Sequence, residues 1–219
     1  MFWSFISAVG RRKDRPARSS APSHQLSQGI LASEILVDAR DARSDSAEVI
    51  VEICIDFCNW CRQDAALLVE EVCADAWKSY YVDFYLAQVN NGGHGQFAGN
   101  SSMRPAELDF IDQGLAAMGA ADFLSVFRDF RSAMDADPIL LEAVIEGGGF
   151  GDIPPVIQAL DNRFFTLKGT QRLLGQNAAW LKSLPSWTPL ELDELRRRKA
   201  AILTANRFRS ERMTASLRR

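Results

Sequence analysis

The sequence predicts an all-α protein: a single compact multi-helix domain with a basic, disordered N-terminal segment and a long basic C-terminal helix. Three observations predict this fold class. Apolar residues recur three and four positions apart through most of the chain. No alternation of apolar and polar residues lasts long enough to indicate a strand. The 219 residues, 47% of them hydrophobic, suffice for one sizeable core. We therefore expect a basic segment at residues 1–29, an acidic helical domain at 30–185 and a basic helix or tail at 186–219.

The N-terminal segment begins with ten largely apolar residues and continues with a stretch rich in Arg, Ser and Pro. Residues 11–29 carry too few large apolar side chains to offset the entropy of ordering, which predicts disorder. The apolar start is too short to span a membrane, and its basic residues follow it, which is the wrong order for a secretory signal. A weak membrane-surface anchor is the alternative. We expect a bacterial-type, cytoplasmic protein without a transmembrane segment.

Two helices are predicted in the first half of the acidic domain. Ser46 is a favourable N-cap, and the apolar residues after it share one helix face: Ile50, Cys54, Phe57, Cys58 and Cys61. A second helix is predicted from about residue 64 to 89, with an inner face of Val69, Cys73, Ala76, Tyr80 and Phe84. The Asn-Asn-Gly-Gly sequence at 90–93 predicts its end, because Asn and Gly tolerate the left-handed conformation.

Further helices follow from proline and capping signals. Pro105 suits the first turn of a helix that Gly119 closes, and the next helix carries the stripe Phe123, Phe127, Phe130 and Met134. Asp137 and Pro138 predict the cap and first position of a short helix that ends at glycines 147–149. Two more helices are expected, one from near residue 154 and one over about 169–184.

The C-terminal helix is predicted from a capping box. Thr188, Pro189 and Glu191 have the spacing of a Ser/Thr cap, a first-turn proline and a reciprocal acid. This signal predicts one long helix from residue 189 towards residue 212, through the basic run Arg-Arg-Arg-Lys at 196–199.

The cysteines allow two interpretations. Cys54, Cys58 and Cys61 have the spacing of the iron–sulfur motif of radical S-adenosylmethionine enzymes, whose clusters are bound by thiolates. Those enzymes carry the motif in a loop after a strand, whereas here it lies within an amphipathic helical pattern. We interpret the three cysteines as core packing. A metal or iron–sulfur enzyme using Cys54, Cys58 and Cys61, or a zinc site that adds Cys73, remains the alternative.

Histidine and glycine patterns do not predict catalysis. His94 lies in the glycine-rich stretch 92–95 and has no nucleophile or carboxylate at a recognisable spacing, so we interpret it as a turn residue. The glycine-rich stretches lack the Lys-Ser/Thr pair of a phosphate-binding loop. We expect a protein that is not an enzyme and that has no cofactor and no metal.

Charge is segregated along the chain. Residues 1–29 carry a net charge of +4, residues 30–170 carry −14, and residues 171–219 carry +7. An acidic body should repel nucleic acid and attract basic protein surfaces. The candidate surface acids for binding such a partner are Asp109, Asp112, Asp122, Asp129, Asp135, Asp137, Glu142 and Glu146.

Residues 80–101, YYVDFYLAQVNNGGHGQFAGNS, resemble the bacterial DNA mimic protein family, in which an aromatic-rich helix runs into V-x-N-G-G, an aromatic residue and Q-[FY]-x-x-N. Weaker similarities lie at 115–121 and 161–167, and the likeness covers about residues 60–185. His94 and Ala98 depart from the pattern, because the family usually has aromatic residues at both positions. We interpret the motif residues as structural: Asn91, Gly92, Gly93, Gln96, Phe97 and Asn100.

The resemblance implies an all-helical, homodimeric domain whose acidic surface imitates DNA and occupies a DNA-binding regulator. Our leading hypothesis is therefore a non-catalytic domain that binds a basic protein. An immunity-type inhibitor of a basic toxin is one alternative. Another is nucleic-acid or membrane binding through the basic C-terminal helix. We expect the acidic body not to bind nucleic acid directly, whereas the basic tails have the charge to do so or to fold over the body and mask it.

Overall fold

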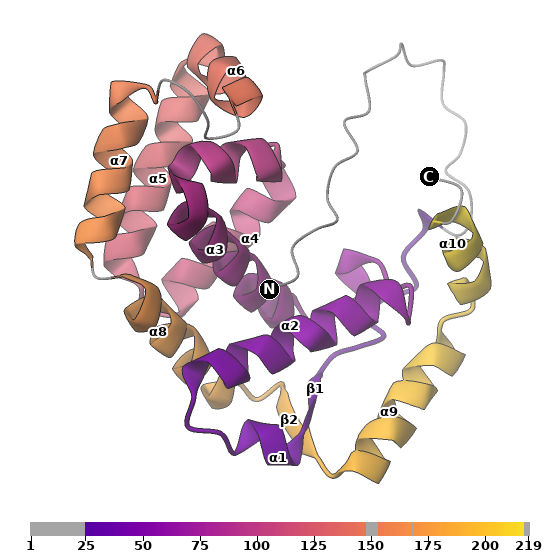
Figure 1. Cartoon of the computed structure of the whole chain (residues 1–219). Coiled ribbons are helices and arrows are strands. Elements are labelled where there is room, and N and C mark those ends of the chain that lie inside the picture. Colours follow the sequence, from indigo (N-terminus) through magenta and orange to yellow (C-terminus); the bar gives the residue numbers. More distant parts are fainter. Residues whose placement is uncertain (1–24, 148–152, 168, 217–219) are drawn as a thin grey trace, which may run out of the picture.

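The computed structural model describes residues 25–147, 153–167 and 169–216, and within them the chain is almost entirely helical (Figure 1). The predicted all-α fold class is confirmed. The apolar start at 1–10, most of the basic segment 11–29 and glycines 148 and 149 lie outside the described residues. In the described part, no helix is long and apolar enough to cross a membrane.

Most predicted helices are confirmed. They are α2 (Ala47–Gln63), α4 (Pro105–Ala117), α5 (Ala121–Ala136), α6 (Pro138–Gly147), α7 (Pro155–Thr166) and α8 (Gly169–Ser183). Their starts follow from the predicted caps. The Ser46 hydroxyl accepts a hydrogen bond from Val49 N at 3.4 Å, and Asp137 Oδ1 accepts bonds of 3.0 Å from the N–H groups of Ile139 and Leu140.

Helix α3 (Ala74–Ser101) differs from the prediction at both ends. It begins ten residues later than expected, because the chain after α2 first forms a turn and the short 3₁₀ helix η2 (Val69–Glu71). The predicted stop at 90–93 is a kink, and the helix continues beyond it. Gly93 has φ of +71°, and a Cβ there would collide with the Asp161 carboxylate. The continuation is held in place because His94 and Phe97 are buried in the core.

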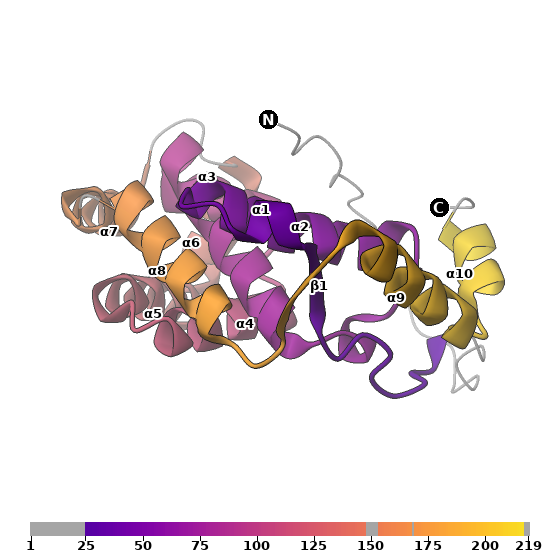
Figure 2. The same ribbon diagram turned by 90° about the horizontal axis from the view of Figure 1, so that it is seen from below.

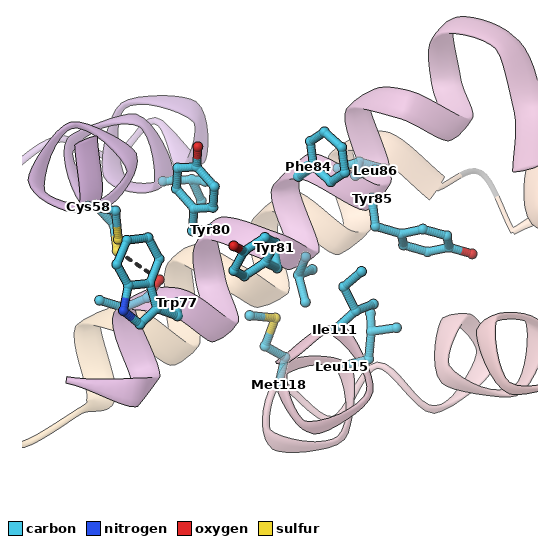
Figure 3. Packing of buried hydrophobic residues seen from close by; sticks show 14 of the residues in the cluster. Cys58, Trp77, Tyr80, Tyr81, Phe84, Tyr85, Leu86, Ile111, Leu115 and Met118 are labelled. Carbon is cyan, nitrogen blue, oxygen red and sulfur yellow. Dashed lines mark hydrogen bonds between the residues drawn. The ribbon is translucent and has the colours of Figure 1, made fainter. Parts of the chain in front are cut away.

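Helix α3 is the centre of the molecule. It is buried nearly all round, which is typical of a helix enclosed by others. Figure 3 shows its aromatic side chains reaching Cys58 of α2 on one side and Ile111 and Leu115 of α4 on the other. The contact with α4 requires Gly114, because a Cβ there would lie 2.7 Å from a Val82 methyl group and 3.0 Å from a backbone oxygen of α3.

A small parallel sheet corrects the expectation that the chain has no strands. Strand β1 (Ile35–Asp38) pairs with β2 (Trp187–Leu190), with Ile35 opposite Trp187 and Asp38 opposite Leu190. The predicted capping box is therefore wrong. Thr188 and Pro189 belong to β2, and the next helix begins at Leu192 after Glu191. The short helix α1 (Ala39–Ala42) follows β1 and is capped by Asp38.

The C-terminal part consists of two helices where one was predicted. Helix α9 (Leu192–Ala205) ends at Asn206 and α10 (Arg209–Ser216) follows. Asn206 is buried, and its side-chain amide donates to the carbonyl oxygens of Ala65 and Ala66 at 2.7 and 3.2 Å, which turns the chain back onto the body. Figure 2 shows α9 and α10 at the opposite end of the molecule from α5 and α7.

Candidate protein-binding surface

Half of the eight acidic candidates form ion pairs with arginines on neighbouring helices. Asp112 of α4 accepts two hydrogen bonds of 2.8 Å from Arg128 of α5, and this bonding holds the pKa of Asp112 below its usual value. Three further pairs of 2.7–2.8 Å join Asp109 to Arg131, Asp122 to Arg172 and Asp129 to Arg163. These four carboxylates connect α4, α5, α7 and α8, and arginine offsets their charge.

The other four candidates lie together in the chain at the end of α5 and along α6. This acidic tip comprises Asp135, Asp137, Glu142 and Glu146, all of them exposed. None forms an ion pair with another described residue, and Asp137 lies at the positive end of the α6 dipole. Ile139 stands in the first turn of α6 with 80% of its surface exposed. The tip therefore combines uncompensated negative charge with an exposed apolar side chain.

A second acidic surface, which sequence reasoning missed, lies on α2. This acidic stripe comprises Glu48, Glu52 and Asp56, which are exposed and share one helix face at intervals of four residues. Neighbouring members are therefore about 6 Å apart along the axis. None is ion-paired within the described ranges, although Lys199 of α9 lies near Asp56 and partly offsets its charge. The spacing of these acids could have predicted the stripe, because it places them on the face of α2 opposite the cysteines.

The basic residues of the C-terminal helices are largely paired as well. Arg196 and Arg197 reach acids one turn earlier on α9. Arg198 pairs with Glu34, and Arg212 of α10 pairs with the buried Glu71. Lys199 lies over the Trp60 ring, 4.9 Å from its centroid. The basic run at 196–199 consequently presents much less free positive charge than its sequence indicates.

His94 is a core residue, which corrects its interpretation as a turn residue. Its side chain is completely buried, with Nδ1 2.6 Å from Asp161 Oδ1 and Nε2 2.9 Å from the Tyr85 hydroxyl. An ionised carboxylate only accepts hydrogen bonds, so Nδ1 donates to Asp161, and Nε2 and the Tyr85 hydroxyl share the second hydrogen bond. Burial raises the pKa of Tyr85 well above its usual value. The imidazole of this chain of three polar groups lies between the rings of Phe130 and Phe164.

The other motif residues connect the two halves of α3. Gln96 donates from Nε2 to Gln88 Oε1 at 2.9 Å, and Asn100 donates to the same oxygen at 2.5 Å. Asn91 donates to Gln96 Oε1 at 2.8 Å. These bonds to Gln88 join the helical segments before and after the kink, which agrees with the interpretation of the motif residues as structural.

Residues 70–184 match the family model described as DMP19-like protein, which covers more than half of the chain. The chain belongs to the DMP19-like family. The match includes the kinked motif of α3, the ion-paired helices α4, α5, α7 and α8, and the acidic tip. It agrees with the resemblance to DNA mimic proteins carried by residues 80–101. No curated protein and no solved structure matches the chain.

The acidic stripe and the cysteines of α2 precede the part that matches the DMP19-like family. Cys54, Cys58 and Cys61 are buried on the inner face of α2. Burial raises the pKa of Cys61 to about 12 and holds that of Cys58 well above its usual value, so both remain thiols at neutral pH, whereas metal sites bind thiolates. Cys73 is only half-buried and stands at the start of α3. Among the described residues, no three His, Cys, Asp or Glu side chains are arranged to hold a metal ion.

Proposed function

We propose that this DMP19-like protein is a non-catalytic binding protein whose acidic helical body occupies a basic, DNA-binding protein in the bacterial cytoplasm. The observation that carries the proposal is the acidic tip inside the family-matched region, whose exposed carboxylates have no ion-pair partner among the residues that the structure describes. Membership of the family and the net charge of −14 over residues 30–170 support it. A homodimer, which the family likeness implies, is part of the proposal and is tested by light scattering after size exclusion.

The pairing pattern indicates which acids carry the interaction. A carboxylate already bonded to arginine loses much of its outward field, and exchanging that arginine for one on a partner gains little free energy. The acidic tip has no such competition, so a basic partner neutralises its charge without breaking an existing pair. We therefore assign partner binding to Asp135, Glu142 and Glu146, and assign Asp109, Asp122 and Asp129 to holding the helices together.

The carboxylate geometry also supports imitation of DNA. A phosphate backbone presents closely and regularly spaced negative charges. On one helix face, carboxylates three or four residues apart lie about 5–6 Å from each other. Glu142 and Glu146 have this spacing on α6, as do the members of the acidic stripe on α2. Arginines that bind phosphates are suited to such an array, because they also bind carboxylates bidentately.

The test compares two variants with the same change of charge. In the tip variant, Asp135→Asn, Glu142→Gln and Glu146→Gln remove three unpaired charges. In the matched control, Asp109→Asn, Asp122→Asn and Asp129→Asn remove three paired ones. Asp137 is kept because it caps α6. Tagged full-length chains serve as bait in lysate, and duplex DNA is added to half of the samples.

We expect the wild-type chain to retain a basic DNA-binding protein that duplex DNA releases. The tip variant should bind that protein at least about tenfold more weakly. Each surface charge contributes only modest affinity, but this variant removes three of them together. The control should bind nearly normally after circular dichroism confirms its fold. Equal loss in both variants would contradict the assignment to the tip. Retention of nucleic acid by the chain itself, with no protein partner, would contradict the proposed function.

A further inference from the structure

Glu71 is a completely buried carboxylate whose counter-ion comes from the far end of the chain. Arg212 of α10 donates from Nη1 to Glu71 Oε2 at 2.6 Å and from Nη2 to Oε1 at 2.9 Å. The same guanidinium donates to the carbonyl oxygens of Ala66 and Leu26 at 3.1 and 3.0 Å. These four oxygens form an arginine socket, defined by the Glu71 carboxylate and the carbonyl groups of Leu26 and Ala66.

The body residues orient the socket independently of α10. Glu71 Oε2 accepts a hydrogen bond from Leu68 N at 3.0 Å, and Oε1 accepts one from Gln28 N at 2.8 Å. Burial opposes ionisation, but the bonds from Arg212 and from these two N–H groups outweigh it and lower the pKa of Glu71. The socket therefore presents two charged oxygens in fixed directions, which is the arrangement that a planar guanidinium binds bidentately.

Apart from Arg212, α10 buries little surface, although Arg209 Nε also donates to the Asp64 carbonyl oxygen at 2.7 Å. Arg212 is the single buried residue among the described positions of this helix. Met213 and Ala215 face an open pocket of about 540 Å³, lined also by Gln25, Arg62 and Leu68, so the contact between α10 and the body is incompletely filled. Little apolar surface opposes detachment, and segments with few buried apolar contacts open most readily. Attachment mainly through arginine hydrogen bonds also makes exchange by another arginine feasible.

We propose that α10 is a displaceable cover over the arginine socket, and that an arginine-bearing segment of the basic partner takes its place. The identity of the occupant rests on the proposed function. DNA-binding proteins use arginine to grip the two oxygens of a phosphate, and the Glu71 carboxylate presents a similar oxygen pair. In this arrangement Arg212 is the internal substitute for the partner's arginine, and it keeps the Glu71 charge compensated until a partner binds.

The first test measures hydrogen exchange of α10 in the full-length chain. We expect α10 amides to exchange through a local opening that leaves α3 protected. Glu71→Gln should speed this exchange by roughly tenfold or more, because a buried, hydrogen-bonded charge pair loses one partner. Glu70→Gln is the matched control, since it removes the neighbouring but exposed acid of η2. Exchange of α10 only together with α3 would overturn the proposal, because the cover would then open only on global unfolding.

The second test uses a labelled peptide of residues 205–216 as the probe for the socket. It should bind the full-length Arg212→Gln chain at least about tenfold more tightly than the wild-type chain, whose socket is filled. The double variant Glu71→Gln, Arg212→Gln should bind it as weakly as the wild type. Circular dichroism verifies that each variant is folded, and the exchange measurement on the wild type does not depend on them. Equal binding to all three chains would overturn the proposal.

These two tests need only this chain, so they do not depend on whether a DNA-binding partner exists. A captured partner that binds the Glu71→Gln chain as tightly as the wild type would overturn occupation of the socket by the partner. It would leave the proposed function intact, since the acidic tip would still account for capture.

Discussion

Replacing His94 with phenylalanine tests whether the buried polar chain of Tyr85, His94 and Asp161 stabilises the fold. Phenylalanine retains an aromatic ring among Phe130 and Phe164 but removes both side-chain hydrogen bonds of His94. The Tyr85 hydroxyl would then be buried without its partner. Asp161 would keep the bond from the His94 backbone N–H at 2.8 Å and partial contact with water. An unsatisfied buried polar group costs about 1–3 kcal/mol, so we expect a loss of about 2–4 kcal/mol in unfolding free energy.

A double-mutant cycle with Tyr85→Phe makes the prediction specific. In the wild type, Tyr85→Phe leaves His94 Nε2 unsatisfied and should cost about 1–2 kcal/mol. In the His94→Phe background the same change removes the orphaned hydroxyl and should recover about 1 kcal/mol. The coupling between the two sites is then about 2–3 kcal/mol, which is large for neighbouring residues that share one network.

Urea denaturation followed by far-ultraviolet circular dichroism measures each corner of the cycle. Tyr81→Phe on the same helix is the control, since its hydroxyl makes only a 3.4 Å bond to Glu107, and it should cost less than about 0.5 kcal/mol. If the effects of His94→Phe and Tyr85→Phe add within about 0.5 kcal/mol, the network does not act as a unit and the reasoning is refuted.

Three further predictions concern the core and its titrating groups. Phe127→Ala should lower the unfolding free energy, measured by urea denaturation, by about 3–5 kcal/mol, because Phe127 is completely buried in the aromatic cluster. A smaller loss would show that neighbouring side chains close the cavity left by the ring. Mass spectrometry after thiol alkylation at pH 8 should find Cys73 modified before Cys58 and Cys61, whose thiols burial keeps protonated, and equal rates would contradict this. Burial raises the pKa of Asp83 from 3.8 to about 6, so this group favours the folded state below pH 3.8 and that contribution is lost as pH rises through 6. Asp83→Asn should therefore stabilise the protein at pH 7.5 by about 1–2 kcal/mol and have little effect near pH 3.5; destabilisation at pH 7.5 in urea titrations would contradict the assignment.

The sequence was sufficient to place helices whose signals are local. Ser46 and Asp137 cap the helices predicted for them, and the Phe123 to Met134 stripe is buried as its spacing indicates. The stop predicted at 90–93 was wrong because two glycines accommodate a kink as readily as an end. The positions of His94, Phe97 and Ala98, three and four residues apart, are the sequence signal that could have predicted the continuation of the helix.

Interactions between distant parts of the chain could not be predicted from the sequence. Strand β2 forms only because β1, about 150 residues earlier, lies beside it, so the local capping signal at Thr188 is overridden. The arginine partners of Asp122 and Asp129 lie 50 and 34 residues away, and nothing in the acidic pattern distinguishes these residues from the unpaired Asp135. The socket at Glu71 likewise depends on Arg212, 141 residues later.

The packing of helix α2 determines which fragments of this protein can be expressed in folded form. The family-matched region starts at residue 70, yet α2 packs Cys54, Phe57 and Cys58 against α3 and α8, which both lie inside that region. A fragment cut at the boundaries of homology would expose Trp77 and Tyr80 to water and would lose the strand pair that joins residues 35–38 to 187–190. Such a fragment should aggregate or unfold on purification. The family-matched region is thus shorter than the domain that packs together, and expressed fragments should include the whole of that domain.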